Sequence, residues 1–116
     1  MSKYFTYEEV SCRCGCGLSV RRELVNLLDD AREIAQIPFR ISSGARCEAH
    51  NRKVGGSKDS SHLKGIAVDI KATTSRERYK IANALMQVGF NRIGIAKTFI
   101  HCDIDRDKPQ QVIWIY

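Results

Sequence analysis

His62 and Asp69 are residues of the right types and spacing to bind a metal ion. His62 follows a turn-rich segment, residues 55–60, whereas Asp69 falls in residues 66–70, which alternate like a half-buried strand. An imidazole from the loop and a carboxylate from the strand could therefore converge on one point. With a second imidazole they would form the ligand set of a catalytic zinc, which keeps one position open for water. The alternative is an unrelated loop histidine and a surface aspartate.

His101 can supply the second imidazole. It lies in residues 99–104, whose strand pattern places His101 and Asp103 on the same face. His62, Asp69 and His101 could therefore form a His-Asp-His site at the surface of a sheet. Neutral imidazole nitrogens and a carboxylate suit Zn²⁺, and the vacant fourth position would hold a water molecule of lowered pKa.

Two helices are expected to support this sheet. Apolar residues at helical spacing predict the first over residues 19–36, with Ser19 as its N-cap, and Pro38 disfavours helix just beyond it. The second should begin at a capping box formed by Thr74 and Glu77 and end at Gly89.

The remaining patterns predict strands. We expect them over residues 39–42, 66–71, 92–97, 99–104 and 111–116, with a hairpin-type turn at 105–109 and a loop over 44–60. Two helices among about five strands indicate an α+β fold with an antiparallel sheet. At 116 residues the chain is expected to be a single domain, in which residues 1–18 form an extended, cysteine-rich N-terminal arm.

Five cysteines are many for this length. They are Cys12, Cys14, Cys16, Cys47 and Cys102. A four-thiolate zinc site usually needs two closely spaced pairs, and the second pair is missing. One or two disulfides from the N-terminal cluster, with Cys47 as a candidate partner, are expected in an oxidising compartment, and reduced thiols in a cytosolic one. We expect the cluster to be structural rather than catalytic.

The net charge of +6 favours a polyanionic partner such as nucleic acid, anionic lipid or an acidic cell-wall polymer. No nucleic-acid-binding motif accompanies the scattered basic residues, so we expect no nucleic acid partner. No apolar run reaches membrane-spanning length, and we expect no membrane insertion. Residues 1–6 lack the apolar core of a secretory signal, so a protein that acts outside the cytoplasm would need another means of delivery.

Three motifs stand between about residues 41 and 103: Ser43-Gly44-Ala45-Arg46, Ser60-x-His62-x-x-Gly65-x-Ala67-x-Asp69 and His101-x-Asp103. In these motifs the sequence resembles the M15 family of zinc D-Ala-D-Ala carboxypeptidases and related peptidoglycan peptidases. That family includes phage endolysins and shares its metal-site architecture with the Hedgehog signalling domain. The His50-Asn51 pair belongs to the family pattern, and we expect it to support the site or form a cleft wall.

The resemblance implies a role for each of five residues. His62, Asp69 and His101 would be the ligands of one zinc ion per chain. Arg46 would bind the substrate carboxylate or the developing oxyanion, since a guanidinium can hold either with two hydrogen bonds. Ser60 would orient the loop and contact the substrate.

The general base departs from the family pattern. Several members carry a carboxylate three residues before the last zinc histidine, where this chain has Thr98, and others a histidine two residues before it, where this chain has Phe99. Asp103 could act as the base or could hold His101 in place. A loop residue, of which Asp59 is one, is the other candidate.

The function that the resemblance implies is zinc-dependent hydrolysis of D-amino-acid-containing bonds in peptidoglycan stem peptides, as a carboxypeptidase or an endopeptidase. Small size and basic charge resemble a phage lysin that is released from the host cytoplasm at lysis and degrades the cell wall. The expected partner is the stem peptide, and the expected form is a monomer. The alternative is a non-catalytic zinc module that binds the cell wall or a partner protein.

Overall fold

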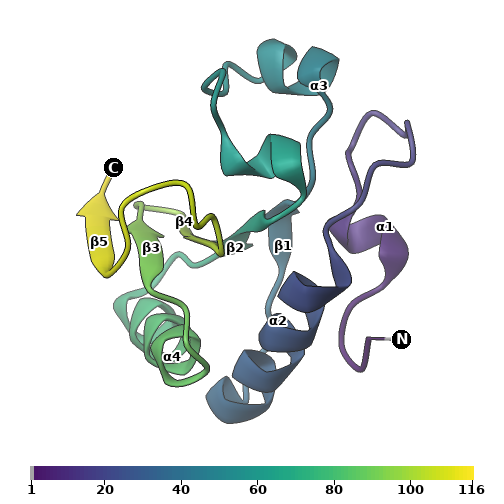
Figure 1. The fold of residues 1–116 in the computed structure, drawn as a ribbon. Coiled ribbons are helices and arrows are strands. Elements are labelled where there is room, and N and C mark those ends of the chain that lie inside the picture. The colour runs from purple at the N-terminus through teal and green to yellow at the C-terminus, as the bar shows by residue number, and fades with distance from the viewer. Residues whose placement is uncertain (1) are drawn as a thin grey trace.

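The chain is built around a five-stranded mixed sheet (Figure 1). The structure, a computed structural model, describes residues 2–116. In spatial order the strands are β1 (Ile41–Ser43), β2 (Ala67–Lys71), β4 (Phe99–Asp103), β3 (Arg92–Ile95) and β5 (Val112–Ile115). The helices are α1 (Tyr7–Val10), α2 (Arg22–Ala35), α3 (Glu48–Lys53), the 3₁₀ helix η1 (Ser61–Lys64) and α4 (Ser75–Gln87). The predicted α+β class is confirmed.

The prediction of two long helices is confirmed by α2 and α4. In α4 the capping box is formed as predicted: the Thr74 side chain accepts from the backbone of Glu77, whose carboxylate accepts from the backbone of Thr74. Helix α2 ends at Ala35, and its C-cap residue, Gln36, is in the left-handed conformation. It begins at Arg22 rather than at Ser19, because Ser19 forms a β-bridge with Ser11 and remains extended.

The prediction of a purely antiparallel sheet is wrong at the last strand. Strands β1 to β4 pair antiparallel, but β5 pairs parallel with β3. The segment after β4 does not form a tight hairpin, because side chains of η1 and β3 hold it by hydrogen bonds. Buried Asp105 accepts a 2.7 Å hydrogen bond from Ser61 and is bound by Lys64, while Arg92 donates a 2.6 Å hydrogen bond to the carbonyl of Pro109. The chain is thereby carried past β4 and turns back along the outer edge of β3.

Two short helices were also missed. Residues 1–18 are not extended throughout, since α1 begins with a capping box formed by Thr6 and Glu9. The predicted loop 44–60 contains α3, whose first turn is capped by the sulfur of Cys47. Neither helix is long enough to show an apolar face in the sequence.

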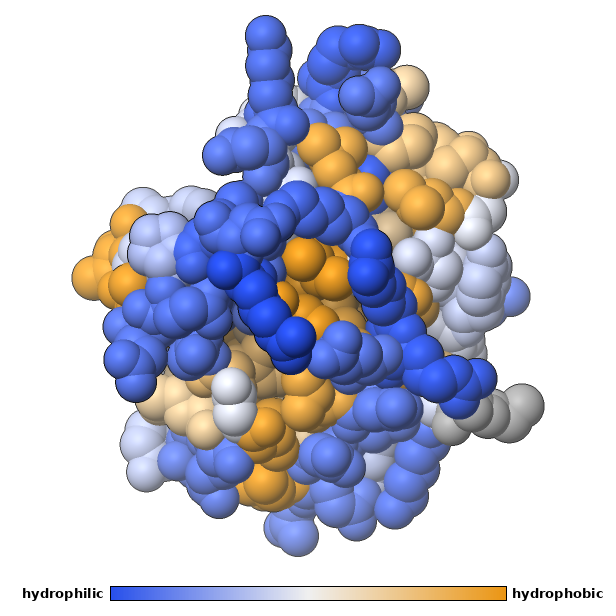
Figure 2. All heavy atoms as spheres, in the orientation of Figure 1, coloured by the Kyte–Doolittle hydropathy of each residue, from blue (hydrophilic) through white to orange (hydrophobic). Residues whose placement is uncertain are grey.

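The sheet has one covered face and one face that is left for a site. Helices α2 and α4 pack together on the covered face (Figure 1), under which Val68, Ile70, Ile100 and Cys102 are fully buried. In this orientation most of the visible surface is hydrophilic, with apolar side chains in smaller patches (Figure 2). Within residues 2–116, no helix combines the length and hydropathy needed to cross a bilayer.

Candidate metal centre

The site is built on a row of residues that runs across four strands. Asp69 on β2 lies opposite His101 on β4, His101 lies opposite Gly94 on β3, and Gly94 lies opposite Trp114 on β5. Because side chains alternate along a strand, these residues share the sheet face that α2 and α4 do not cover. The row therefore places a carboxylate, an imidazole and an indole side by side.

His62 reaches this row from η1. The side chain of Ser60 caps η1 by accepting from the backbone N–H of His62, and Gly65 ends it in the left-handed conformation with φ 72°. The segment 44–46 binds η1 from the other side. The backbone N–H of Arg46 donates to the carbonyl of His62, and the ring Nδ1 of His62 lies 2.7 Å from the carbonyl oxygen of Gly44. These contacts fix the ring so that Nε2 faces Asp69.

The two imidazoles and the carboxylate converge. Nε2 of His62 lies 3.3 Å, and Nδ1 of His101 3.0 Å, from Oδ1 of Asp69. One ligand atom from each residue falls within 4.8 Å of the other two. Burial alone would raise the pKa of Asp69, but the two imidazoles beside its carboxylate lower it to about 2. The carboxylate is therefore ionised.

The hydrogen bonds of the two rings also decide where their lone pairs point. Nδ1 of His62 must carry a proton because a carbonyl oxygen can only accept, and Nε2 of His101 donates to the carboxylate of Asp103 at 2.7 Å. The free lone pairs then face the carboxylate of Asp69. Two imidazole lone pairs and a carboxylate oxygen are the donors that a divalent metal binds, and these residues fit such an ion.

Asp103 is buried behind His101 and fully engaged. One carboxylate oxygen accepts from His101, and the other accepts from Arg92 at 2.7 Å and from the backbone N–H of Asp105 at 3.0 Å. Burial opposes ionisation, but these hydrogen bonds lower the pKa of Asp103 below its ordinary value. Arg92 is itself buried. Asp103 thus sits in an ion-paired network that orients the His101 ring.

Arg46 lies in the cleft above the three residues. Its Nη2 donates to the hydroxyl of Ser60 at 3.3 Å, and its Nε is buried without a hydrogen-bond partner in residues 2–116. Burial lowers the pKa of Arg46, and the neighbouring Asp69 opposes this shift. The side chain stays charged because the ordinary pKa of arginine is so high. A charged guanidinium on the lining of a cleft is suited to bind a carboxylate or an oxyanion.

An open cleft of about 390 Å³ surrounds these residues. Its aromatic wall comes from Phe99, Trp114 and Tyr116, with the rings of His101 and Trp114 5.4 Å apart. Gly94 allows the indole of Trp114 to lie close to the sheet, because a Cβ at position 94 would lie only 2.5 Å from Nε1 of Trp114.

The cleft brings together most of the residues singled out from the sequence. They are Arg46, Ser60, His62, Asp69, His101 and Asp103. Asp59 lies outside this lining, on a separate hollow, and is hydrogen bonded by Ser57. Asn51 is buried and donates to the carbonyl of Ser57, so it supports the loop beside the cleft, whereas His50 does not line the cleft.

Sequence reasoning missed Trp114, Tyr116 and Lys108 as cleft residues. Trp114 and Tyr116 alternate in the last strand, which signals a shared face. The pattern does not say which neighbour that face adjoins, since the answer depends on the parallel pairing of β5. Lys108 lies in the turn that was expected to be a hairpin.

The site has parts that suit a hydrolytic metal centre: three side chains that could hold a metal ion, a cationic group and an open cleft. The protein-family comparison matches the Peptidase M15 model over residues 3–103. No curated protein matches the chain. Because the family match covers most of the 116 residues, the chain belongs to the Peptidase M15 family, whose members are metallopeptidases.

Proposed function

We propose that this protein is a zinc-dependent peptidase that hydrolyses D-amino-acid-containing bonds in the stem peptides of bacterial peptidoglycan. The observation that carries the proposal is the convergence of His62, Asp69 and His101 at the base of an open cleft. Two imidazoles and one carboxylate suit zinc with one coordination position left open. Zinc bound there would polarise the scissile carbonyl and lower the pKa of a water molecule.

Arg46 is proposed to bind the substrate. Its charged guanidinium lines the cleft, so it can hold a terminal carboxylate or the oxyanion that develops during hydrolysis. Lys108 adds a further positive charge to the cleft lining, and the net charge of +6 favours an acidic wall polymer. Ser60 is proposed to orient Arg46 through their hydrogen bond. Stem peptides carry the carboxylates that such a cleft attracts.

Asp103 is proposed as a positioning residue rather than the general base. Its acceptor positions are taken by His101, Arg92 and the backbone of Asp105, and its side chain is only 1% exposed. It therefore has no free oxygen directed at a water molecule in the cleft. Its hydrogen bond instead selects the His101 tautomer that presents Nδ1 to a metal.

Tyr116 is proposed to assist the reaction as a hydrogen-bond donor. It lines the cleft, and burial together with the charges of Asp69 and Asp103 raises the pKa of its phenol. The phenol therefore stays protonated at neutral pH and can donate to a developing oxyanion. Asp59 is a poorer candidate for proton transfer because it lies outside the cleft lining.

The experiment is mass spectrometry of purified peptidoglycan after incubation with the protein, with and without a chelator. We expect peptide fragments only in the sample that retains metal, and the fragment masses identify the bond. Arg46→Ala should lower kcat/KM by about 10²–10³-fold, the usual effect of losing an oxyanion donor. Arg52→Ala is the matched control, because Arg52 is an exposed residue of α3 outside the cleft lining and should leave the rate unchanged.

A second candidate function is a zinc-containing module that binds the cell wall without cutting it. It is favoured by one observation, that the cleft lining offers no carboxylate besides Asp69 and the engaged Asp103. Co-sedimentation with peptidoglycan and no released peptide would support this function and contradict the peptidase.

For the peptidase we propose the cell wall as the place of action, reached on release from the host at phage-induced lysis.

A further inference from the structure

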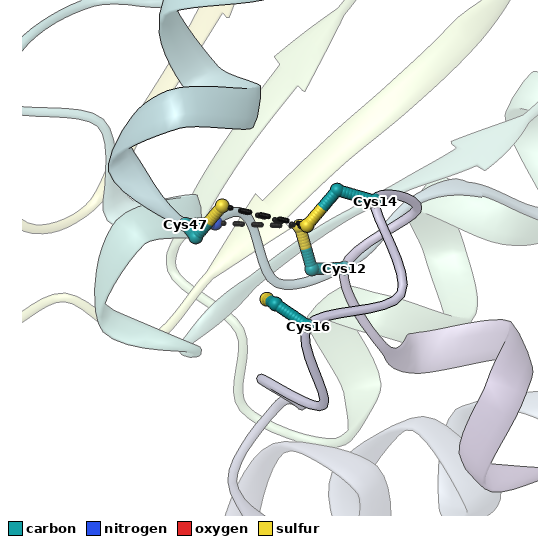
Figure 3. Close-up of side chains that lie close together, drawn as sticks. All are labelled: Cys12, Cys14, Cys16 and Cys47. Carbon is teal, nitrogen blue, oxygen red and sulfur yellow. Dashed lines mark hydrogen bonds between the residues drawn. The ribbon is translucent and has the colours of Figure 1, made fainter.

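Three closely spaced cysteines and a fourth that is distant in the sequence meet at the surface of the fold. Cys12, Cys14 and Cys16 lie between α1 and α2, and Cys47 immediately precedes α3. Figure 3 shows the four side chains directed into one small volume. Their sulfur atoms all lie within 4.8 Å of one another. This thiol cluster is separate from the cleft, whose lining includes none of the four.

The spacing of the sulfur atoms suits a shared metal ion. The Sγ–Sγ distances are 3.3 Å for Cys12–Cys14, 3.8 Å for Cys12–Cys47 and 3.6 Å for Cys14–Cys47. Four sulfurs bound tetrahedrally to zinc at about 2.3 Å are about 3.8 Å apart. Disulfide-bonded sulfurs are about 2.05 Å apart, and within residues 2–116 every cysteine is free.

Backbone groups around the thiol cluster are arranged to support thiolates. The N–H of Cys47 donates to the sulfur of Cys12, and the N–H of His50 donates to the sulfur of Cys47, each at 3.4 Å. Such hydrogen bonds orient the ligands of a metal and stabilise their charge. Gly15 has φ 82°, which lets the chain turn between Cys14 and Cys16.

We propose that Cys12, Cys14, Cys16 and Cys47 bind a second zinc ion, in a structural centre with four thiolate ligands. Soft thiolates in a tetrahedral set select zinc or iron, and a set of four protein ligands leaves no position open for a substrate. The inference does not rest on the proposed peptidase function. It changes the expected zinc content from one ion per chain to two.

The centre would join the N-terminal arm to the segment that carries Arg46. Cys47 is the next residue after Arg46, and Gly44 in the same segment binds the ring of His62. The arm already contacts this segment, since Ala45 donates to the carbonyl of Val10. A metal clamp at Cys47 would therefore hold Arg46 in its place above the cleft.

The first test is the metal content of the full chain purified under reducing conditions. We expect two zinc ions in the wild type, one in Cys14→Ser and one in His62→Ala. Cys14 is exposed, so its substitution removes little packing. Cys102→Ala, the matched control, removes the thiol outside the cluster and should leave both ions. A single zinc that Cys14→Ser retains, or iron in place of zinc, would overturn the proposal.

The second test reads the thiolates directly and does not depend on activity. In the cobalt-substituted wild type, we expect the intense near-ultraviolet absorption of sulfur-to-cobalt charge transfer. The band should be retained by His62→Ala and strongly reduced in Cys16→Ser. Absence of the band from cobalt-loaded wild type would overturn the proposal, as would two disulfides among these cysteines in protein isolated without reductant. A chain that keeps the band but cuts no peptidoglycan refutes only the proposed function.

Discussion

Replacing Asp103 with asparagine tests the role of the hydrogen bond behind His101. The Asp103 side chain is 1% exposed and accepts from His101 at 2.7 Å. Asparagine keeps the size and one acceptor oxygen for Arg92, but it loses the charge that favours the metal-binding tautomer of His101. Loss of such a supporting group lowers metal affinity by about 10–100-fold, which corresponds to about 1.4–2.7 kcal/mol.

The same substitution should also destabilise the fold. Arg92 is 9% exposed and donates to Asp103 at 2.7 Å, so the variant leaves a buried cation without its anion. Hydrogen bonds to charged groups contribute about 1.5–3 kcal/mol. We expect a loss of that size in the free energy of unfolding, measured by urea denaturation, and kinetics should be recorded well below the unfolding temperature.

The assay is the rate of muropeptide hydrolysis as free zinc is varied. Asp103→Asn should need about 10–100 times more free zinc for half its maximal rate, and excess zinc should restore most of kcat. The control is Asp107→Asn, because Asp107 is 87% exposed and its loss should change neither quantity. An unchanged zinc requirement with kcat lowered by about 10²–10⁴-fold would refute the positioning role and identify Asp103 as the base.

Three further changes test other parts of the structure. Gly94→Ala should lower the free energy of unfolding by about 1–3 kcal/mol and raise KM, because its Cβ would lie 2.5 Å from Trp114; urea denaturation and steady-state kinetics check both. Tyr116→Phe should lower kcat with little change in KM, and an unaltered kcat would exclude the phenol as a donor. Asp105→Asn should lower the free energy of unfolding at pH 7 by about 1–3 kcal/mol. Burial would raise the pKa of Asp105, but hydrogen bonds from η1 lower it, so its ionised form stabilises the fold above the unfolded pKa of about 3.9 and this contribution is lost as pH falls through the folded value. The difference between Asp105→Asn and wild type should therefore disappear in acid, and a difference that persists there would contradict the assignment.

The convergence of His62, Asp69 and His101 could be predicted because each position depends on local rules. Strand alternation places Asp69 and His101 on a face, and a turn followed by Gly65 places His62 beside the strand. The spacing of apolar residues likewise predicted α2 and α4. These features need only the residues close to them in the chain.

The parallel strand β5 could not be predicted in this way. Its position depends on buried Asp105, which is bound by Ser61 and Lys64 from a distant part of the sequence. The places of Trp114 and Tyr116 in the aromatic wall of the cleft followed from that pairing and were missed with it. Cys47 was expected to approach the N-terminal cysteines as a disulfide partner. A site shared by all four sulfurs was not expected, because the fourth sulfur is supplied by the fold and not by a neighbouring pair.

The most direct test of the account is the hydrolysis of soluble muropeptides by metal-depleted protein as zinc is added back. We expect no cleavage without zinc, a rate that rises and saturates as the His62–Asp69–His101 site fills, and no cleavage by His62→Ala at any zinc concentration. A zinc-dependent rate in His62→Ala equal to that of the wild type would contradict the account. So would a wild-type protein that holds zinc at this site and cuts no muropeptide.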